Sequence, residues 1–187
     1  MQFVDLSIAG LKVIIPRLFQ DERGFFFESY KRPLFAEEGI DVTFAQDNTS
    51  FSIKGTIRAL HFQSHPGQAK LVTCVQGKIW DVAVDIRPHS PTFTQWEAVE
   101  LDDQNHKQFY IPVGFAHGFA VLSETARVHY KVSAPYDPKT ECSIRWNDPD
   151  FNISWPIKDP ILAPRDKTSP FFKETFLCTG SQAPKGF

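Results

Sequence analysis

The sequence is poor in cysteine and contains no long apolar run. Its three cysteines, Cys74, Cys142 and Cys178, are widely spaced and form no CxxC pair, so we expect neither a disulfide framework nor a structural zinc site. No apolar stretch approaches the roughly 20 residues that a membrane-spanning helix needs. The N-terminus also lacks the basic region and apolar run of a signal peptide. These absences predict a protein of a reducing compartment, the cytoplasm.

A strong charge of one sign is missing as well. With 20 basic and 22 acidic residues, the net charge is −2, which indicates no bulk attraction to nucleic acid or to an anionic membrane. Apolar residues make up 42% of the chain and Phe occurs 18 times, a composition that excludes a disordered protein. We expect one domain over residues 1–187, with a peripheral tail from about residue 171.

What the sequence does have is the two-residue period of β-strands. In residues 78–87, KIWDVAVDIR, the side chains of Trp80 and Val82 fall on one face, and those of Asp81 and Asp85 fall on the other. About ten short segments of this kind follow one another, most of them separated by Gly, Pro, Asp, Asn or Ser. The pattern predicts an all-β protein.

Helix signals are few. Residues 33–39, PLFAEEG, predict one short helix that begins at Pro33 and stops at Gly39. Because no helices alternate with the strands, the sequence predicts a sandwich or barrel of the jelly-roll type with a few short helices. After about residue 150 the chain is rich in proline, and we expect an ordered but irregular wrap there.

One segment has the spacing of a metal-binding loop without its ligands. The spacing is kept by Gly55, His61, Lys70 and Gly77, and that of a second motif by Pro112, Gly114 and His117. It resembles the pattern of cupin barrels, in which a second histidine and a glutamate complete the metal site. Here Gln63 replaces that histidine and Lys70 replaces the glutamate.

These two replacements change the expected chemistry. Protonated lysine has no lone pair for a cation, and His61 and His117 alone are fewer than the three protein ligands of a catalytic zinc. A buried cation beside two histidines suits an anion, or negative charge that develops during a reaction. We therefore expect a site without metal or cofactor, in which Lys70 supplies the positive charge.

Seven segments identify the chain with a known family. In order, they are DERGFFFESY, FAQDNTSFS, GTIRALHFQ, KLVTCVQGKIWDVAVDIRPHSPTF, IPVGFAHGFAVLS, HYKVSAPYDP and IRWNDP. Together they closely resemble the dTDP-4-dehydrorhamnose 3,5-epimerase family of the cupin superfamily, from about Asp21 to about Asp166. The resemblance implies a cupin-type jelly roll and a homodimeric isomerase that needs no cofactor.

The same resemblance implies a reaction. Such an enzyme inverts C3 and C5 of dTDP-4-dehydro-6-deoxy-D-glucose and gives dTDP-4-dehydro-L-rhamnose. It belongs to dTDP-L-rhamnose biosynthesis, which feeds lipopolysaccharide or cell-wall polysaccharide. Both inverted carbons flank a ketone, so the chemistry needs a base on one face of the sugar, an acid on the other, and a cation for the enolate oxygen.

Roles for individual residues follow from the resemblance. It implies that His61 is the base, that Asp166 orients it, and that Tyr130 is the acid. Lys70, with His117 near it, would stabilise the enolate oxygen. The implied substrate-binding residues are Arg23, Glu28, Gln46, Asp47, Asn48, Arg58, Lys70, His117, Glu141 and Arg165. The segment with Arg23 and Glu28 crosses to the partner subunit's site in this family.

Each role has a structural alternative. Tyr130 has the strand parity of a core tyrosine. His117 could simply cap the turn that follows Pro112 and Gly114. Asp166 lies in a polar segment, where an aspartate is usually a solvated surface charge. The Phe-rich segment 21–30 also has the pattern of an edge strand that packs locally.

The sequence departs from the family at several positions. Ala59 stands where the family usually has Gly, Pro135 replaces the first of two paired tyrosines, and Arg165 replaces a frequent Lys. Arg58 and His61 are three residues apart, and a regular strand would place them on opposite faces. If both contact one substrate, a bulge or a strand twist must lie between them.

Other functions stay open at this level. An epimerase that inverts only one carbon of a related 4-keto-6-deoxy sugar nucleotide would keep His61 and Tyr130. A 3,4-ketoisomerase of the same superfamily fits the motifs less well. A metal-dependent cupin oxygenase conflicts with Gln63 and Lys70. A non-catalytic sugar-nucleotide binder would tolerate the loss of His61.

Overall fold

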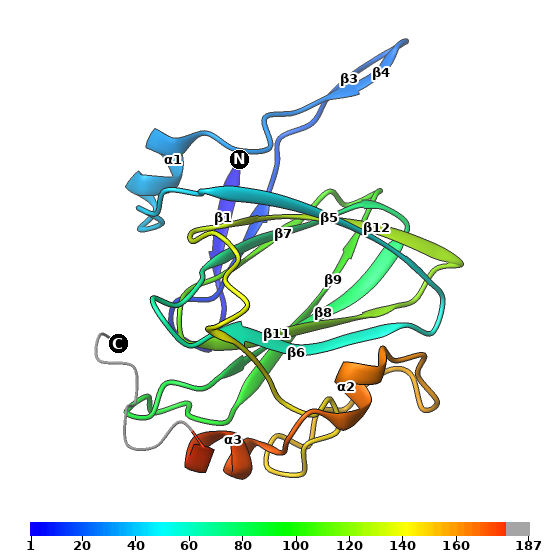
Figure 1. The fold of residues 1–187 in the computed structure, drawn as a ribbon. Coiled ribbons are helices and arrows are strands. Elements are labelled where there is room, and N and C mark those ends of the chain that lie inside the picture. The colour runs from blue at the N-terminus through cyan, green and yellow to red at the C-terminus, as the bar shows by residue number, and fades with distance from the viewer. Residues whose placement is uncertain (179–187) are drawn as a thin grey trace.

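The computed structural model describes residues 1–178 and shows two antiparallel sheets face to face (Figure 1). In their order across the first sheet, the strands are β1 (Gln2–Asp5), β2 (Lys12–Ile15), β10 (Gln108–Ile111), β7 (Lys70–Gln76), β12 (Thr125–Val132) and β5 (Gln46–Ile53). In the second sheet they are β13 (Glu141–Ser143), β6 (Ile57–Gln63), β11 (Phe115–Val121), β8 (Lys78–Asp85) and β9 (Trp96–Asp102). Such a jelly roll confirms the predicted fold class.

The apolar core lies between the two sheets. Its members come from facing strands, among them Phe109 of β10, Val72 of β7 and Phe119 of β11, all at most 4% exposed. The same strands turn short polar side chains and ionisable groups toward one end of this space, where the core gives way to a cavity. The packing of the core therefore fixes the walls of the site.

The outer faces of both sheets are covered in part. The segment after residue 144 runs beneath the second sheet, and Phe151, Trp155 and Phe172 pack against it; this is the predicted irregular wrap. It contains α2 (Pro164–Thr168) and α3 (Phe172–Cys178). On the first sheet, α1 (Arg32–Glu37) packs through Phe35. This helix lies where the sequence predicted one, with proline in its first turn.

The alternation predicted for residues 78–87 is present in β8, but both of its faces are buried. Trp80 and Val82 pack beneath the wrap. Asp81 and Asp85, on the other face, are 0% exposed. Two-sided burial therefore brings a carboxylate into the interior next to the cavity, which the alternation alone did not indicate.

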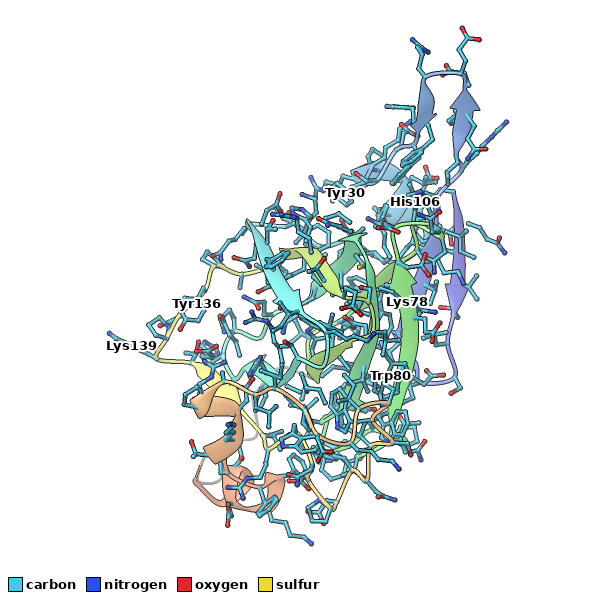
Figure 2. All side chains as sticks on the ribbon, turned by 90° about the vertical axis from the view of Figure 1, so that its right-hand side faces the viewer. Tyr30, Lys78, Trp80, His106, Tyr136 and Lys139 are labelled. Atoms are coloured by element: carbon cyan, nitrogen blue, oxygen red, sulfur yellow. The ribbon has the colours of Figure 1, made fainter. Side chains whose placement is uncertain are left out.

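A hairpin of β3 (Phe19–Asp21) and β4 (Gly24–Phe26) projects from the rest of the molecule (Figures 1 and 2). Phe19, Phe25 and Phe26 are each more than half exposed. At the base of the hairpin, Phe25 and Phe27 contact the ring of His106. We call residues 19–26 the arm.

Two further predictions concern the ends and the surface of the chain. Of the predicted peripheral tail, residues 172–178 form α3, whose first residue, Phe172, is buried, and residues 179–187 lie outside the described part. Within residues 1–178, no helix is long and apolar enough to cross a membrane.

Candidate active site

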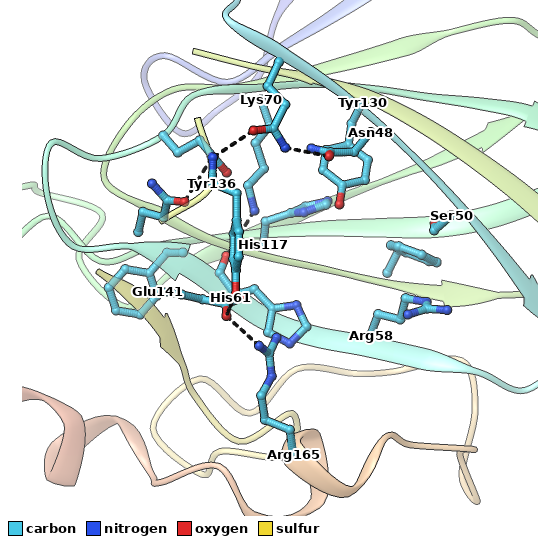
Figure 3. Close-up of a pocket in the computed structure, with 15 residues that line it drawn as sticks. Asn48, Ser50, Arg58, His61, Lys70, His117, Tyr130, Tyr136, Glu141 and Arg165 are labelled. Carbon is cyan, nitrogen blue, oxygen red and sulfur yellow. Dashed lines mark hydrogen bonds and ion pairs between the residues drawn. The ribbon is translucent and has the colours of Figure 1, made fainter. Parts of the chain in front are cut away.

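A cavity of about 340 Å³ opens between the two sheets at one end of the jelly roll (Figure 3). Its walls come from β5 and β12 on one side and from β6 and β11 on the other, with β13 and α2 at the rim. Nine of the predicted site residues line it: Gln46, Asn48, Arg58, His61, Lys70, His117, Tyr130, Glu141 and Arg165. The fold therefore gathers residues that are up to 119 positions apart in the sequence, from Gln46 to Arg165.

A bulge in β6 brings Arg58 and His61 to the same cavity. Where β6 pairs with β11, His61 lies opposite His117, and Arg58 lies opposite Phe119. Three steps along β6 therefore match two steps along β11, and the register shifts between them. The prediction that a bulge or twist must separate Arg58 from His61 is confirmed.

His61 is held by a carboxylate from another element. Its Nε2 lies 2.8 Å from Oδ1 of Asp166, which is only 2% exposed. Asp166 belongs to α2, which contacts β6. Burial opposes the charge of Asp166, but hydrogen bonds from His61 and from the Ala59 N–H, with the charge of Arg165, lower the pKa of this carboxyl below its ordinary value. An ionised Asp166 fixes the imidazole and stabilises its protonated form.

Lys70 places a buried ammonium group in the cavity wall. The residue is 6% exposed, and its Nζ donates a hydrogen bond to the His61 carbonyl at 3.2 Å. Burial lowers the pKa of Lys70 to about 8, although the charges of Asp81 and Glu141 oppose the shift. At neutral pH most of this group is therefore still charged, but it is poorly solvated, which strengthens its attraction for an anion.

His117 is paired with Asp81, a residue that the sequence did not single out for the site. Nε2 of His117 lies 2.9 Å and 3.0 Å from the two carboxylate oxygens of Asp81. Burial lowers the pKa of His117, even though Asp81 works against that shift. His117 is therefore neutral near pH 7, and the positive charge at this wall belongs to Lys70.

Tyr130 faces the cavity from β12, opposite His61 on β6 (Figure 3). Its ring also packs against the core between the sheets. Burial raises the pKa of Tyr130, against a smaller opposing effect of Arg58. The phenol therefore keeps its proton at neutral pH. The core-packing alternative and the site role thus apply to two parts of one side chain, its ring and its hydroxyl.

A hydrogen-bond network closes one side of the cavity mouth. Gln46 donates to Asn48 at 2.7 Å and accepts from the backbone N–H of Tyr136 at 2.8 Å. The Tyr136 hydroxyl donates to Glu141 at 2.9 Å, and Arg165 pairs with Glu141 at 2.7 Å. Tyr136 is 54% exposed beside the opening. An aromatic side chain therefore stands at the mouth even though Pro135 replaces its neighbouring tyrosine.

Gln63, at the position of a cupin metal ligand, has a structural role. Its amide donates to the Pro135 carbonyl at 3.3 Å, and its Oε1 accepts from the Asp137 N–H at 3.2 Å. The side chain thus anchors the loop that carries Tyr136. Among residues 1–178, no three His, Cys, Asp or Glu side chains converge in a way that would hold a metal ion.

Three of the predicted residues do not reach this cavity. Asp47 points to the outer face of β5, because strand alternation separates it from Gln46 and Asn48, and it pairs there with Lys131 at 2.9 Å. The side chain of Asp47 therefore lies outside the cavity of its own chain, and its contact with substrate stays a prediction. Arg23 and Glu28 lie on or next to the arm, away from the cavity of their own chain. This placement is compatible with the predicted crossing to a partner, which a single chain does not test.

The sequence reasoning missed other residues of the cavity wall. Ser50 and Phe119 line it, and Asp81 supports it from behind. Ser50 shares strand parity with Gln46 and Asn48, and this signal was available in the sequence. The sequence offers only one signal for Asp81, which is its place in an otherwise apolar strand, an unusual position for a carboxylate.

Comparisons with known proteins agree with this geometry. A family model described as dTDP-4-dehydrorhamnose 3,5-epimerase matches residues 5–174. The dTDP-4-dehydrorhamnose 3,5-epimerase of Salmonella typhimurium is 47% identical over 180 residues, which are 95% of this chain and 98% of that protein. The dTDP-4-dehydrorhamnose 3-epimerase of Streptomyces niveus is 42% identical over 169 residues, 89% of this chain and 82% of the other.

A solved structure extends the likeness to the fold. The dTDP-6-deoxy-D-glucose-3,5-epimerase of Legionella pneumophila, in complex with dTDP-4-keto-L-rhamnose, has a TM-score of 0.88 and 46% identity. The match covers 91% of this chain and 92% of that one. The likeness in sequence and fold therefore includes the strands that form the cavity.

Proposed function

Because the chain belongs to the dTDP-4-dehydrorhamnose 3,5-epimerase family, we propose that it inverts C3 and C5 of dTDP-4-dehydro-6-deoxy-D-glucose to give dTDP-4-dehydro-L-rhamnose. The observation that carries this proposal is the placement of His61 and Tyr130 on facing walls of one cavity, with Lys70 in the same cavity. A base and an acid on opposite sides of a sugar are what inversion of a carbon requires.

The first half of each inversion is a proton abstraction. His61 takes a proton from the carbon next to the ketone. The electron pair of that C–H bond forms a double bond to the ketone carbon, and the π pair of the C=O bond moves to the oxygen, which gives an enolate. Asp166 stabilises the imidazolium that forms, because it is ionised and 2.8 Å away. The ammonium of Lys70 stabilises the enolate oxygen, as a preorganised charge in a poorly solvated wall.

The second half is reprotonation from the opposite face. The phenol of Tyr130 carries its proton at neutral pH, because burial raises its pKa. It gives that proton to the carbanionic carbon, the electron pair returns from the oxygen, and the ketone forms again with the carbon inverted. His61 then releases its proton to solvent and Tyr130 takes one up, which returns both groups to their starting forms. Repetition at the second carbon, on the other side of the ketone, completes the double epimerisation.

We assign the nucleotide to the side of the cavity that carries Arg58. Its Nε donates to Ser52 at 2.9 Å and a terminal nitrogen donates to the Phe51 carbonyl at 3.3 Å. The remaining donors of the guanidinium are available for a diphosphate. At the mouth, Arg165 and the network of Gln46, Asn48 and Glu141 supply further polar contacts.

We further propose that the active enzyme is a homodimer whose arms cross to the partner subunit's site. The arm exposes Phe19, Phe25 and Phe26 together with Arg23, a combination that suits an interface better than a free surface. Arg23 and Glu28 would then reach the diphosphate side of the partner's cavity. In this arrangement neither subunit has a complete site on its own.

We also propose that residues 1–187 form a single epimerase domain with a peripheral end, and that it works in the cytoplasm. Packing of α2 and of the wrap against the second sheet supports one domain. Cys74 and Cys142 are free thiols in the described chain, as a reducing compartment allows.

A single-carbon epimerase is the second candidate function. The 42% identity to a dTDP-4-dehydrorhamnose 3-epimerase supports this alternative. The same His61, Tyr130 and Lys70 would serve both enzymes, and the shape of the cavity would decide how many carbons the base reaches.

Loss of the base and loss of the acid test the proposed roles. We expect His61→Ala to abolish turnover while the protein stays folded, and Tyr130→Phe to slow reprotonation selectively. His129→Ala is the matched control, because His129 adjoins Tyr130 on β12 but lies on the opposite face and does not line the cavity. Unchanged turnover in the first two variants would refute the assignments.

A further inference from the structure

Asp81 binds one side chain of the cavity wall, His117, without reaching the cavity itself. It lies on β8, is 0% exposed, and is absent from the lining. Its two carboxylate oxygens lie 2.9 Å and 3.0 Å from Nε2 of His117. His117 and Lys70 both line the cavity, and the charge of Asp81 acts on both of them.

Among residues 1–178, Lys70 forms no direct ion pair, and Asp81, which binds the neighbouring His117 of the cavity wall, is the carboxylate whose charge acts on it most strongly. Its hydrogen bond goes to a neutral acceptor, the carbonyl of His61, at 3.2 Å. Of the two carboxylates that act on it, Asp81 has a larger effect than Glu141, and Glu141 is already paired with Arg165. An ammonium that is almost fully buried loses its proton readily unless a negative charge lies near it.

The hydrogen bond to His117 has a second effect. Burial raises the pKa of Asp81, whereas the charge and hydrogen bond of His117 and the charge of Lys70 favour its ionised form. An ionised carboxylate only accepts hydrogen bonds, so opposite the ionised form Nε2 of His117 carries the hydrogen. In a neutral ring, Nδ1 then has none. Asp81 therefore fixes both the orientation and the tautomer of the imidazole at the cavity wall.

We propose that Asp81 is a positioning residue of the epimerase: it holds His117 in one orientation and tautomer, and it keeps Lys70 in its charged form. This inference rests on the proposed function for the reaction that the two residues serve. Asp81 itself does not line the cavity, and it reaches the site through His117, which does.

The charges of His117 on β11 and Lys70 on β7 act on Asp81, and the charge of Asp81 acts on Cys74 of β7. Around these groups, His61 on β6 acts on His117, and Glu141 on β13 acts on Lys70. Of these groups, Lys70 is the one whose charged form an ionised Asp81 favours near pH 8. The titration of Lys70 therefore reports most directly on the role of Asp81.

The chain offers a closely matched control for a substitution at Asp81. Asp85 lies on the same strand and the same face and is also 0% exposed. Its carboxylate binds Arg87 at 2.7 Å and 2.8 Å, and it does not line the cavity. Asp81→Asn and Asp85→Asn thus remove the same charge from equally buried positions of one strand.

The first measurement is the titration of Lys70 in the unliganded protein. In protein labelled with ¹³C-lysine, the Lys70 signal is identified by its loss in Lys70→Met. We expect Asp81→Asn to lower the titration midpoint of Lys70 by about one pH unit or more, and Asp85→Asn to leave it unchanged. If Asp81→Asn does not fold, Asp81→Val replaces the buried charge with an apolar group and takes its place. An unshifted midpoint would overturn the inference.

The second measurement is the pH profile of turnover. We expect Asp81→Asn to lower kcat by about tenfold at pH 7.5 with little change in KM, and to move the alkaline limb of the profile to lower pH. Asp85→Asn should leave the limb in place. A kcat loss without movement of the limb would mean a merely structural role and would overturn the inference. A wild-type protein without epimerase activity would refute the proposed function, whereas the Lys70 titration would still decide whether Asp81 holds its charge.

Discussion

At the scale of single residues, the site depends on charges that burial would neutralise without nearby partners. The carboxylate of Asp166 keeps its charge through hydrogen bonds from His61 and the Ala59 backbone. The ammonium of Lys70 has fewer partners, and its pKa falls to about 8. The position of a cupin metal ligand is thus taken by a cation whose charge the protein only partly compensates. The incomplete compensation should lower the free energy of unfolding by a measurable amount.

Lys70 should make stability and activity respond to pH in opposite directions. Because the pKa of Lys70 is about 8 in the folded protein and 10.5 is its ordinary value, the unfolded chain binds more protons between these two values. The contribution of Lys70 to the free energy of unfolding therefore rises with pH from about 8 to 10.5. Turnover needs the charged form and should fall over the same range.

The variant Lys70→Met isolates this contribution. We expect it to be more stable than the wild type by roughly 3 kcal/mol at pH 7, and we expect the gap to narrow toward pH 10. It should also have lost turnover. Urea unfolding of both proteins at pH 7 and pH 9.5 measures the gap. A gap that stays constant with pH would show that Lys70 is not destabilised by its burial.

Sequence reasoning reached the residues that a motif carries and missed those that only packing reveals. His61, Lys70 and Tyr130 lie inside recognisable segments, and nine of the predicted residues line the cavity. Asp81 was visible as the polar face of an alternating strand, but alternation does not tell whether that face meets water or the interior. Asp47 lies in the same segment as Gln46 and Asn48, but strand parity places its side chain on the outer face.

At the scale of elements, the bulge in β6 sets the relative position of Arg58 and His61. A close contact with β11 holds this region. A Cβ added at Gly118 would lie 2.4 Å from the Ala59 Cβ and 2.9 Å from the Arg58 carbonyl oxygen. Glycine at 118 is therefore required both by the Cβ of Ala59 and by the backbone of β6 at residues 58 and 59.

Gly118→Ala should displace β6 and with it the base and the diphosphate ligand. We expect a loss of about 1–3 kcal/mol in stability from overpacking, and a larger relative loss in turnover. Ala59→Gly in the same protein removes the closest contact, with the Ala59 Cβ, but leaves the backbone contacts at 2.9 Å, so it should restore part of both. Thermal unfolding and kcat of the single and double variants test this. A double variant as impaired as Gly118→Ala would contradict the steric account.

The short helices of the C-terminal half could not be predicted from sequence patterns. Helix α2 has five residues, Pro164–Thr168, which is too short to show a helical period. Its role is to present Asp166 to His61, which lies 105 positions earlier in the chain. The proline content of this segment predicts an irregular wrap, as the structure has it, whereas only the resemblance points to Asp166.

At the scale of the whole molecule, the arm is the feature that one chain leaves unexplained. Residues 19–26 stand away from both sheets and expose three phenylalanines (Figure 2). Arg23 contacts only Asp21 within the described chain, at the tip of the same hairpin. A crossing arm in a twofold dimer would bury these rings and complete two equivalent sites.

Mixed dimers test the crossing directly. Arg23→Ala removes a residue of the arm, and His61→Ala removes the base of the cavity. If the arm crosses, a mixed dimer has one site with both residues intact, so an equimolar mixture that has exchanged subunits should regain about one quarter of the wild-type activity. The control mixes His61→Ala with Lys70→Met, which damage the same cavity and cannot complement each other. Absence of recovery in the first mixture, once exchange is verified, would place the arm on its own subunit.

The most direct test of the central claim is hydrogen exchange at the two carbons that flank the ketone. Purified protein is incubated with dTDP-4-keto-6-deoxyglucose in D₂O, and deuterium is located in the sugar by NMR. A double epimerase predicts deuterium at both C3 and C5, with both signals absent in His61→Ala. Deuterium at one carbon only would contradict double inversion and favour the single-carbon epimerase, and no deuterium at either carbon would contradict epimerisation of this substrate.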